Sequence, residues 1–358
     1  MWKDTSFTRL VKIDYPVIQA GMAGGATTPE LVAAVSNAGG LGTLGAGYLN
    51  PQAIRAAIRS VRSHTEKPFA VNLFIPEPSQ AVSSMTDTAM EAWLRDYGQA
   101  RGFDPQPEVH TVIPTNFQEQ FEIVLKERVP VFSFTFGLPA REVVEACQEQ
   151  NIATIGTATT VNEAMLLEEV GVDAVCAQGS DAGGHRGTFA HPALQALIGT
   201  MALLPQVADA VHIPVIGAGG IMDGRGVLAS LSLGAAAAQL GTAFLTCTES
   251  GAHPAYQSAL LARPEHSTVL TRAFSGKYAR GIRNQFIEDA STYSGDIPAY
   301  PVQNTLTQPL RRWATATGNP ELMSLWAGQG LRLSRKASAA DLVRHLVEEV
   351  EAALCKFR

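Results

Sequence analysis

The chain has 358 residues, 46% of them hydrophobic and 17% charged, so it can bury a large core and fold without a partner. Its 27 Lys and Arg residues and 33 Asp and Glu residues give a formal charge of -6 with no run of like charge, which excludes a nucleic-acid-binding or polybasic membrane surface. The four cysteines lie far apart, with no CxxC pair and no histidine at metal-ligand spacing, so neither a disulfide framework nor a metal site is expected. We expect a small-molecule partner and a cytoplasmic protein with reduced thiols.

No segment of the chain predicts export or membrane insertion. Residues 1–16 alternate charged and apolar side chains and lack the apolar core of a signal peptide. The longest apolar stretch, Val227–Cys247, is interrupted by Gly234, Gln239 and Gly241 and is rich in Ala and Ser instead of Leu. It predicts a buried helix followed by a buried strand.

Eight short apolar runs recur along the chain, punctuated by Gly, Asn, Gln or Thr. Most are uninterrupted instead of alternating, which is typical of strands buried on both faces of a parallel sheet. The runs are residues 17–21, 40–47, 68–74, 129–137, 152–158, 174–179, 213–220 and 236–244.

Amphipathic helical patterns lie between these runs, with apolar residues three and four positions apart and charges between them. The first begins with Thr28 as N-cap and Pro29 in the first turn, and it ends near Gly39. The others are residues 51–64, 117–128, 140–150, 161–171 and 224–234. Most strand-to-strand intervals are about 22 to 28 residues, the length of one strand–helix unit, and eight such units predict an α/β fold of the (β/α)8 TIM-barrel type.

Two departures from this spacing predict additions to the barrel. The interval between Phe74 and Val129 is roughly 35 residues too long, which predicts an insertion after the third strand at about residues 75–114. After Cys247 the pattern changes to a region punctuated by Pro and Gly. We expect residues 1–249 to form the barrel, residues 250–330 a smaller C-terminal cap or substrate subdomain, and residues 331–358 a final helix, Ala339–Ala353, that returns to the barrel.

Residues at the strand ends of such a barrel face one common mouth, where the ligand binds. In this chain they are rich in glycine and amides and poor in charge. They are Gln19, Gly21 and Met22 of the first strand, Asn72 of the third, Gln178, Gly183, Gly184 and His185 of the sixth, Gly217, Gly219 and Gly220 of the seventh, and Gln239, Leu240, Gly241 and Thr242 of the eighth.

Glycines after the seventh and eighth strands predict a phosphate site. Backbone N–H groups at positions such as Gly219 and Gly220 are free to hold a phosphate, and Asp223 and Gly224 open a helix whose positive end is expected to face the same place. Residues 40–45 also match GxGxxG, but they follow a helix and span the second strand, which is the wrong context for a dinucleotide fingerprint.

His185 is the strongest candidate for a base. It follows a glycine pair at the mouth, so its neighbours do not shield its ring. No lysine ends a strand, which disfavours a Schiff base, and the mouth offers few carboxylates for metal chemistry. Such a site predicts a bound cofactor. The amides of Asn72 and Gln178 suit the donor–acceptor edge of a flavin ring, and the phosphate cradle suits FMN.

With these motifs the chain resembles the nitronate monooxygenases, formerly called 2-nitropropane dioxygenases, and it is similar to the class that carries the catalytic histidine. The resemblance runs through most of the chain, and the joint occurrence of the motifs in order is specific for this flavin-barrel family. One departure is Asp181, where the family often has Glu, which keeps the charge. The motifs are QAGMAGGATTPELVAAVSNAGGLGTLGAG at Gln19–Gly47, NLF at Asn72, FGLP at Phe136, AQGSDAGGHRG at Ala177, GAGGI at Gly217, QLGTAF at Gln239, FSGKYARGIRNQF at Phe274 and WAGQG at Trp326.

The resemblance implies a flavoprotein oxidoreductase that oxidises alkyl nitronates, or nitroalkanes after deprotonation, with O2 to carbonyl compounds and nitrite. Two alternatives stay open: an FMN-dependent enoyl-acyl-carrier-protein reductase or NAD(P)H:quinone reductase, and a non-catalytic phosphate-ligand-binding barrel. No pattern indicates the oligomeric state. The resemblance also implies His185 as catalytic base and FMN held by Met22, Asn72, Gln178, Gly183, Gly184, Gly219, Gly220, Gln239, Leu240, Gly241 and Thr242.

Overall fold

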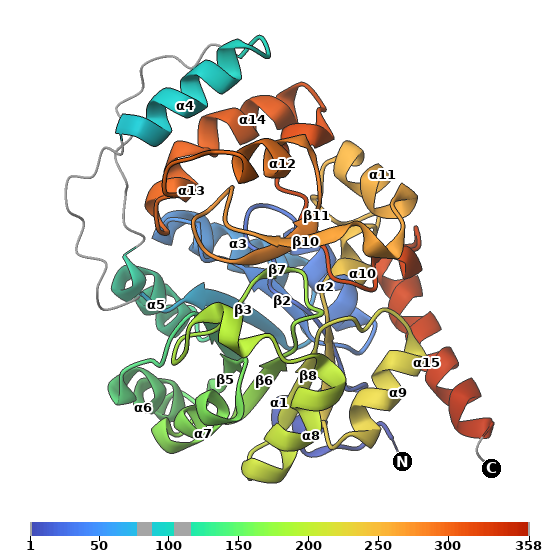
Figure 1. Ribbon diagram of the computed structural model, residues 1–358. Coiled ribbons are helices and arrows are strands. Elements are labelled where there is room, and N and C mark those ends of the chain that lie inside the picture. Colours follow the sequence, from blue (N-terminus) through green and yellow to red (C-terminus); the bar gives the residue numbers. More distant parts are fainter. Residues whose placement is uncertain (1, 77–87, 104–115, 357–358) are drawn as a thin grey trace.

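The eight apolar runs form eight parallel strands of one sheet, which closes into a barrel (Figure 1). The computed structural model describes residues 2–76, 88–103 and 116–356. Neighbouring strands pair in the order β1-β9-β8-β6-β5-β4-β3-β2, and a parallel bridge between Ile18 and Leu41 joins the two ends. The predicted (β/α)8 TIM barrel is confirmed. Its strands are β1 (Val17–Gln19), β2 (Gly42–Gly45), β3 (Phe69–Phe74), β4 (Val131–Thr135), β5 (Ala153–Ala158), β6 (Ala174–Gln178), β8 (Val215–Ala218) and β9 (Ala237–Leu240).

Amphipathic helices cover the outside of the barrel (Figure 1). The first of them begins as expected, because the Thr28 side chain accepts a hydrogen bond from the Leu31 N–H and Pro29 occupies the first turn. The buried faces of most of them share one hydrophobic cluster with the outward-facing strand residues, whereas Val227 of the last helix belongs to a separate cluster. These helices are α2 (Pro29–Asn37), α3 (Pro51–His64), α5 (Phe117–Lys126), α6 (Arg141–Glu149), α7 (Val161–Val170), α8 (Thr200–Ala210) and α9 (Gly224–Ser232).

The last helix, α15 (Ala339–Cys355), packs against α2 and α9. Leu346 and Val350 are fully buried in one cluster with Leu31 of α2 and Val227 of α9. α15 therefore covers the outside of the barrel at β9 and at the neighbouring strand β1.

The eighth apolar run changes from strand to helix within its length. The end of the eighth strand was predicted at Gln239–Thr242, and β9 ends at Leu240. The backbone turns at Gly241 and continues as the short helix α10 (Thr242–Leu245). Four residues are too few to cover a strand, so the wall beside β9 depends on α15.

A short helix at the N-terminus, α1 (Ser6–Val11), was not predicted from the sequence. It lies at the end of the barrel opposite the cap (Figure 1), and Phe7 is fully buried in one cluster with the barrel residues Ile18 and Ile216. The Thr5 hydroxyl donates to the Ala236 carbonyl over 2.7 Å, which ties the helix to β9. The α1 helix therefore covers this end of the barrel.

Residues 250–330 build the cap above the barrel (Figure 1). A three-stranded sheet in the order β10-β11-β7 joins it to the barrel, because β7 (Gly184–His185) belongs to the loop after β6. We propose to treat these residues as a subdomain, since Phe274 and Phe286 centre a second hydrophobic cluster. The further elements of the chain are η1 (Ala193–Ala196), α11 (Pro254–Ala262), η2 (Glu265–Ser267), β10 (Thr268–Thr271), β11 (Ala279–Ile282), α12 (Gln285–Ser291), α13 (Val302–Leu306), α14 (Gln308–Ala316), η3 (Pro320–Leu322) and η4 (Leu331–Leu333).

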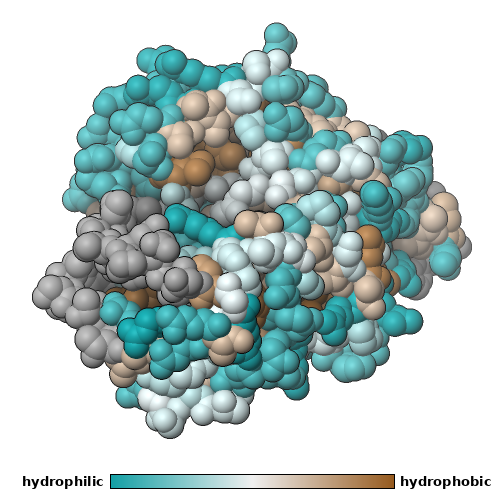
Figure 2. Space-filling model, turned by 90° about the horizontal axis from the view of Figure 1, so that it is seen from above, coloured by the Kyte–Doolittle hydropathy of each residue, from teal (hydrophilic) through white to brown (hydrophobic). Residues whose placement is uncertain are grey.

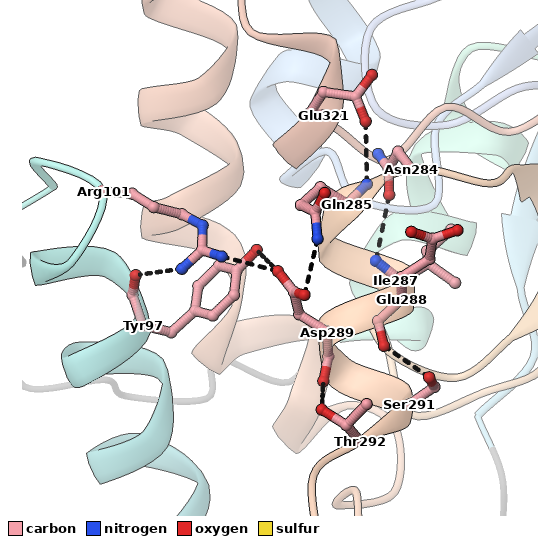
Figure 3. A network of polar contacts seen from close by, with 10 residues as sticks. All are labelled: Tyr97, Arg101, Asn284, Gln285, Ile287, Glu288, Asp289, Ser291, Thr292 and Glu321. Carbon is pink, nitrogen blue, oxygen red and sulfur yellow. Dashed lines mark hydrogen bonds and ion pairs between the residues drawn. The ribbon is translucent and has the colours of Figure 1, made fainter.

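Part of the expected insertion at residues 75–114 lies outside the described residues, namely 77–87 and 104–114. Its described helix, α4 (Thr88–Gln99), packs on the cap (Figure 1). Figure 3 shows the polar side of this contact: the Asp289 carboxylate of α12 accepts hydrogen bonds from the Tyr97 hydroxyl, the Arg101 guanidinium and the Gln285 amide at 2.8 to 3.0 Å. Because one carboxylate receives donors from both segments, it fixes α4 to α12.

The glycines of the GxGxxG spacing serve packing. A Cβ at Gly42 would lie 2.1 Å from the Val32 carbonyl oxygen, and one at Gly45 would lie 2.5 Å from the Met22 carbonyl carbon. Both contacts are far shorter than van der Waals contact, so these positions let β2 approach α2 and the loop after β1.

We expect Gly42→Ala to lower the free energy of unfolding by about 1 to 3 kcal/mol, because the added methyl group overpacks the α2–β2 contact. Urea denaturation followed by circular dichroism measures this change. Gly199→Ala is the control, since its backbone has φ of -65° and its Cβ would meet only the Asp181 Oδ2 at 3.7 Å. Equal unfolding midpoints for the two variants would contradict the prediction.

Candidate active site

A cavity of about 1280 Å³ lies at the carboxyl ends of the strands, between the barrel and the cap. This exceeds the volume of a typical single-ligand pocket, so it can hold a cofactor and a substrate together. Figure 2 shows the face on the cap side, where apolar residues are recessed among hydrophilic ones. The predicted site residues that line the cavity are Met22, Asn72, Gln178, Gly183, Gly184, His185, Gly219, Gly220, Gln239, Gly241 and Thr242.

Leu240 does not line this cavity. Its side chain is fully buried in the cluster formed by β9, α2 and α15. Successive strand residues point to opposite faces, so Gln239 faces the barrel interior while Leu240 faces the helices. Gln19 and Gly217 also lie outside the cavity lining. The Gln19 amide is bonded to the Thr43 backbone inside the barrel.

His185 lies in the strand that joins barrel and cap. Its backbone pairs with Ala279 of β11, and its half-buried ring lies between two aromatic rings. The ring centroids of Phe136 and Trp326 are 5.9 and 5.2 Å from that of His185. The ring is therefore held by the cap as well as by its own turn, and its exposed part faces the cavity.

Ser275 fixes the proton position on this ring. Its hydroxyl is 2.7 Å from the His185 Nε2 and 3.1 Å from the Lys277 carbonyl oxygen. We assign the hydroxyl proton to the Lys277 carbonyl and a ring proton to Nε2, so that the hydroxyl oxygen accepts from Nε2 and from the Lys277 N–H, the latter over 3.3 Å. The Nδ1 lone pair is then the free basic position of the ring.

The environment keeps His185 neutral. Burial lowers the pKa of His185 from its ordinary value of 6.5 to about 3, and the nearby charges of Lys277 and Arg311 act in the same direction. At physiological pH the imidazole is therefore unprotonated and can accept a proton.

Gln178 and Arg186 hold the turn that carries His185. The Gln178 amide donates to the His185 carbonyl over 3.0 Å and accepts from the Gly187 N–H over 2.8 Å. The Arg186 guanidinium, 1% exposed, donates to the carbonyls of Gln178, Gly179 and Ala196. Because both ends of the Gln178 amide are bonded within the loop, its first task is to position the histidine.

Glycines allow the turn before His185 to lie directly against the cap backbone. A Cβ at Gly183 would lie 2.6 Å from the backbone of Ala327 and Gly328, so the turn packs directly on the WAGQG segment. Gly184 has φ of 77°, a left-handed conformation that favours glycine. Gly183 thus lines the cavity and also lies directly against the cap backbone.

The turn after β8 presents backbone donors to the cavity. Gly219 and Gly220 have φ of 126° and 68°, and a Cβ on Gly219 would lie 2.6 Å from the Thr200 hydroxyl oxygen. The N–H groups of Gly219, Gly220 and Gly241 have no acceptor within the described ranges. Such uncommitted amides in a glycine turn form an anion site.

The N-terminus of α9 does not join this anion site, so that prediction was wrong. The Gly224 N–H donates to the Glu349 carboxylate of α15 over 2.8 Å, and the N–H groups of Arg225 and Gly226 donate to Asp223. The two carboxylates occupy the positive end of the helix. Arg225 and Arg335 pair with these carboxylates in turn.

Two further amides, those of Asn72 and Gln239, belong to residues that line the cavity. The Asn72 amide donates to the Ser133 hydroxyl over 3.0 Å, and the Gln239 amide is 3.4 Å from the Cys176 sulfur. The oxygen atoms of both amides have no donor in the part of the chain that the structure describes. They can therefore accept hydrogen bonds from a ligand.

Several cavity residues were not predicted as site residues. They come from the loops after β2 and β4 and from the cap, and although some of them lie in the motifs quoted above, no local pattern predicts that the chain returns them to the mouth. These unpredicted residues are Tyr48, Phe136, Arg311 and Trp326, with Ser275 behind the histidine.

Within the described ranges no cluster of three or more metal-ligating side chains occurs, and no helix is long and apolar enough to cross a membrane.

Comparison with known proteins places these features in a family. The family model described as nitronate monooxygenase matches residues 4–349. A curated protein of Staphylococcus aureus (strain JH9), named "Probable nitronate monooxygenase", is 48% identical over 351 residues, covering 98% of each chain. A crystal structure of nitroalkane oxidase from Streptomyces ansochromogenes is similar at a TM-score of 0.91 with 40% identity, covering 98% of this chain and 99% of that chain. FabK from Thermotoga maritima is similar at a TM-score of 0.78 with 30% identity, covering 99% and 98%.

The lowered pKa of His185 predicts a pH dependence of stability. The unfolded chain binds a proton on this residue below 6.5, whereas the folded chain does so only near 3. The stability that the neutral ring contributes is therefore fully present above pH 6.5 and is lost as the pH falls towards 3. The slope cannot exceed about 1.4 kcal/mol per pH unit, because this residue takes up at most one proton on unfolding.

Denaturant titrations of the wild type and His185→Asn between about pH 7 and about pH 5 measure this effect. We expect the free energy of unfolding of the wild type to fall relative to that of the variant as the pH is lowered. A difference that does not change with pH would contradict the assignment.

Proposed function

The chain belongs to the nitronate monooxygenase family, and we propose that it oxidises alkyl nitronates and nitroalkanes with O2 to carbonyl compounds and nitrite, with FMN as cofactor and His185 as general base. The observation that carries this proposal is a neutral histidine whose Nε2 is committed to Ser275 and whose ring borders a large cavity. A carbon acid next to a nitro group needs only such a placed base to become a nitronate.

The cavity fits a flavin mononucleotide. The uncommitted N–H groups of Gly219, Gly220 and Gly241 suit one phosphate, and the oxygens of Asn72 and Gln239 suit donors on the flavin ring. Met22, Gly184 and Thr242 complete the proposed cofactor surface. Bound there, the flavin would supply the electron-accepting chemistry that these side chains lack.

The chain's own residues then have distinct tasks. Nδ1 of His185 takes the proton from the carbon that bears the nitro group, while Ser275 holds Nε2. Gln178 and Arg186 keep the turn in place, and the Phe136 and Trp326 rings exclude water from one side of the base. A nitronate has already lost this proton, so it does not need the base.

An FMN-dependent reductase that uses NAD(P)H is the second candidate, because the chain is also similar to FabK over nearly its full length. Anaerobic mixing with NADH separates the two proposals. Rapid bleaching of the flavin at micromolar NADH would favour the reductase, whereas slow or absent bleaching favours nitronate oxidation.

We expect the purified protein to hold FMN, not FAD, without covalent attachment, because one glycine cradle accounts for one phosphate. Gly220→Val should release the flavin and leave the barrel folded, since a branched side chain would enter the cradle. Gly171→Val is the control, because it imposes a similar strain at φ of 96° outside the cavity lining, where a Cβ would meet only Gln148 at 3.7 Å and Val144 at 3.9 Å.

Flavin absorbance after gel filtration measures retention in both variants, and chromatography after heat release identifies the flavin. A colourless wild type that FMN cannot reconstitute, or a stoichiometric adenine signal, would refute the cofactor assignment.

His185→Asn should lose turnover of neutral nitroalkanes by about 100-fold or more and keep turnover of the preformed nitronates. The physical reason is that only the neutral substrate must give up a proton. Nitrite release with each substrate measures this, at equal flavin content. His191→Asn serves as the control, because that histidine is exposed and outside the cavity lining. An equal loss on both substrates would show that His185 binds or positions the substrate and does not act as the base.

A further inference from the structure

Arg311 of α14 is a cation that borders the cavity. Its Nε donates to the Thr307 hydroxyl over 3.1 Å, and its Nη2 donates to the Asn304 backbone and side-chain oxygens over 2.7 and 2.9 Å. These neighbours hold the guanidinium in place without neutralising it. Within the described ranges no carboxylate lies within ion-pair distance of Arg311.

The lack of a carboxylate partner is unusual for a guanidinium withdrawn from solvent. Burial lowers the pKa of Arg311, and the Tyr48 hydroxyl across the cavity acts in the opposite direction. Removing a charge from water is costly unless an opposite charge or hydrogen bonds compensate it. The Nη1 of Arg311 makes no hydrogen bond to the described residues, so a ligand can use it.

The position of Arg311 in the cavity indicates which part of a bound ligand it can contact. Tyr48 follows β2, and Phe136 follows β4, so this part of the mouth belongs to the β2–β4 half of the barrel. The glycine cradle follows β8, which lies on the other side of β1 in the sheet order. Arg311 therefore serves a different group from the one that the cradle holds. His185 borders the same cavity and lies between Phe136 and Trp326.

We propose that Arg311 forms an oxyanion subsite at the substrate end of the cavity, where its free Nη1 donates to the oxygens of the nitro or nitronate group. The inference rests on the proposed function and adds a catalytic residue to it. When Nδ1 of His185 takes the α-proton, the C–H electron pair becomes the second bond of C=N, and the negative charge moves to the nitro oxygens. Arg311 donates hydrogen bonds to these oxygens and stabilises the charge as it forms.

Nitrate tests the subsite without turnover, because it is a planar anion with the same N–O geometry. Isothermal titration of the full-length protein should give a nitrate Kd that is about tenfold higher or more for Arg311→Gln than for the wild type. Arg311→Lys should fall between the two, since it keeps the charge and loses the contacts with Thr307 and Asn304 that hold the guanidinium in place. Arg283→Gln removes the same charge from an exposed position of the cap outside the cavity lining, and its Kd should equal that of the wild type.

Kinetics give an independent readout. A nitronate carries its charge before the reaction, so Arg311→Gln should raise its KM by about tenfold; a neutral nitroalkane develops the charge in the transition state and should lose kcat instead. Should Arg311→Gln not fold, the intermediate behaviour of Arg311→Lys decides the question. Nitrate affinity that is unchanged in both variants, or loss of flavin from Arg311→Gln, would overturn the subsite. If the wild type turns over no nitro compound but nitrate binding depends on Arg311, the proposed function fails and the oxyanion subsite stands.

Discussion

The antiparallel pairing between β7 and β11 is the contact on which the site depends. It makes the loop after β6 a strand of the cap, with Gly184 opposite Arg280 and His185 opposite Ala279. The Arg186 N–H extends the pairing to the Tyr278 carbonyl over 2.9 Å. A slip of one residue in this register would turn the histidine side chain to the other face of the small sheet and away from the cavity.

Buried charges around this pairing are compensated in different ways, and the difference separates structural from functional residues. Glu163 is fully buried and accepts hydrogen bonds from the Thr159 backbone and hydroxyl and from the N–H groups of Phe189 and Ala190. Arg186 donates to three carbonyls nearby. These two residues clamp both ends of the histidine loop, so their polar groups are spent on the fold. Arg311 keeps donor capacity for a ligand, which marks it as part of the site.

The sequence predicts the barrel side of this site well and the cap side poorly. Apolar runs and strand ends are local patterns, so His185, Gly219 and Gly220 are predicted at the mouth, and the structure places them there. The error at Leu240 arises because a strand end predicts a neighbourhood and not a side-chain direction. The occupied end of α9 could not be predicted, since its partner Glu349 is 125 residues away in the chain.

Cap residues share this difficulty. Ser275 reaches the histidine across 90 positions of sequence, and Arg311 and Trp326 reach the cavity through packing of the second hydrophobic cluster. Two of the motifs that carry the family resemblance, FSGKYARGIRNQF at Phe274 and WAGQG at Trp326, contain Ser275 and Trp326, but neither motif predicts which side chains face the barrel. Within the expected insertion, only α4 and its flanking residues are described, and they pack on the cap.

The divided origin of the cavity wall has a consequence for how this enzyme can diverge. On the proposed function, barrel strand ends hold the cofactor, while α14 and the segment around Trp326 face the substrate. Substrate preference can then change through substitutions in the cap that leave the cofactor cradle intact, so recombination or directed evolution aimed at residues 300–330 would alter selectivity with little loss of holoprotein. The β7–β11 pairing limits which cap substitutions are tolerated. There a strand of the cap pairs with the loop after β6, so a change in either strand displaces the other.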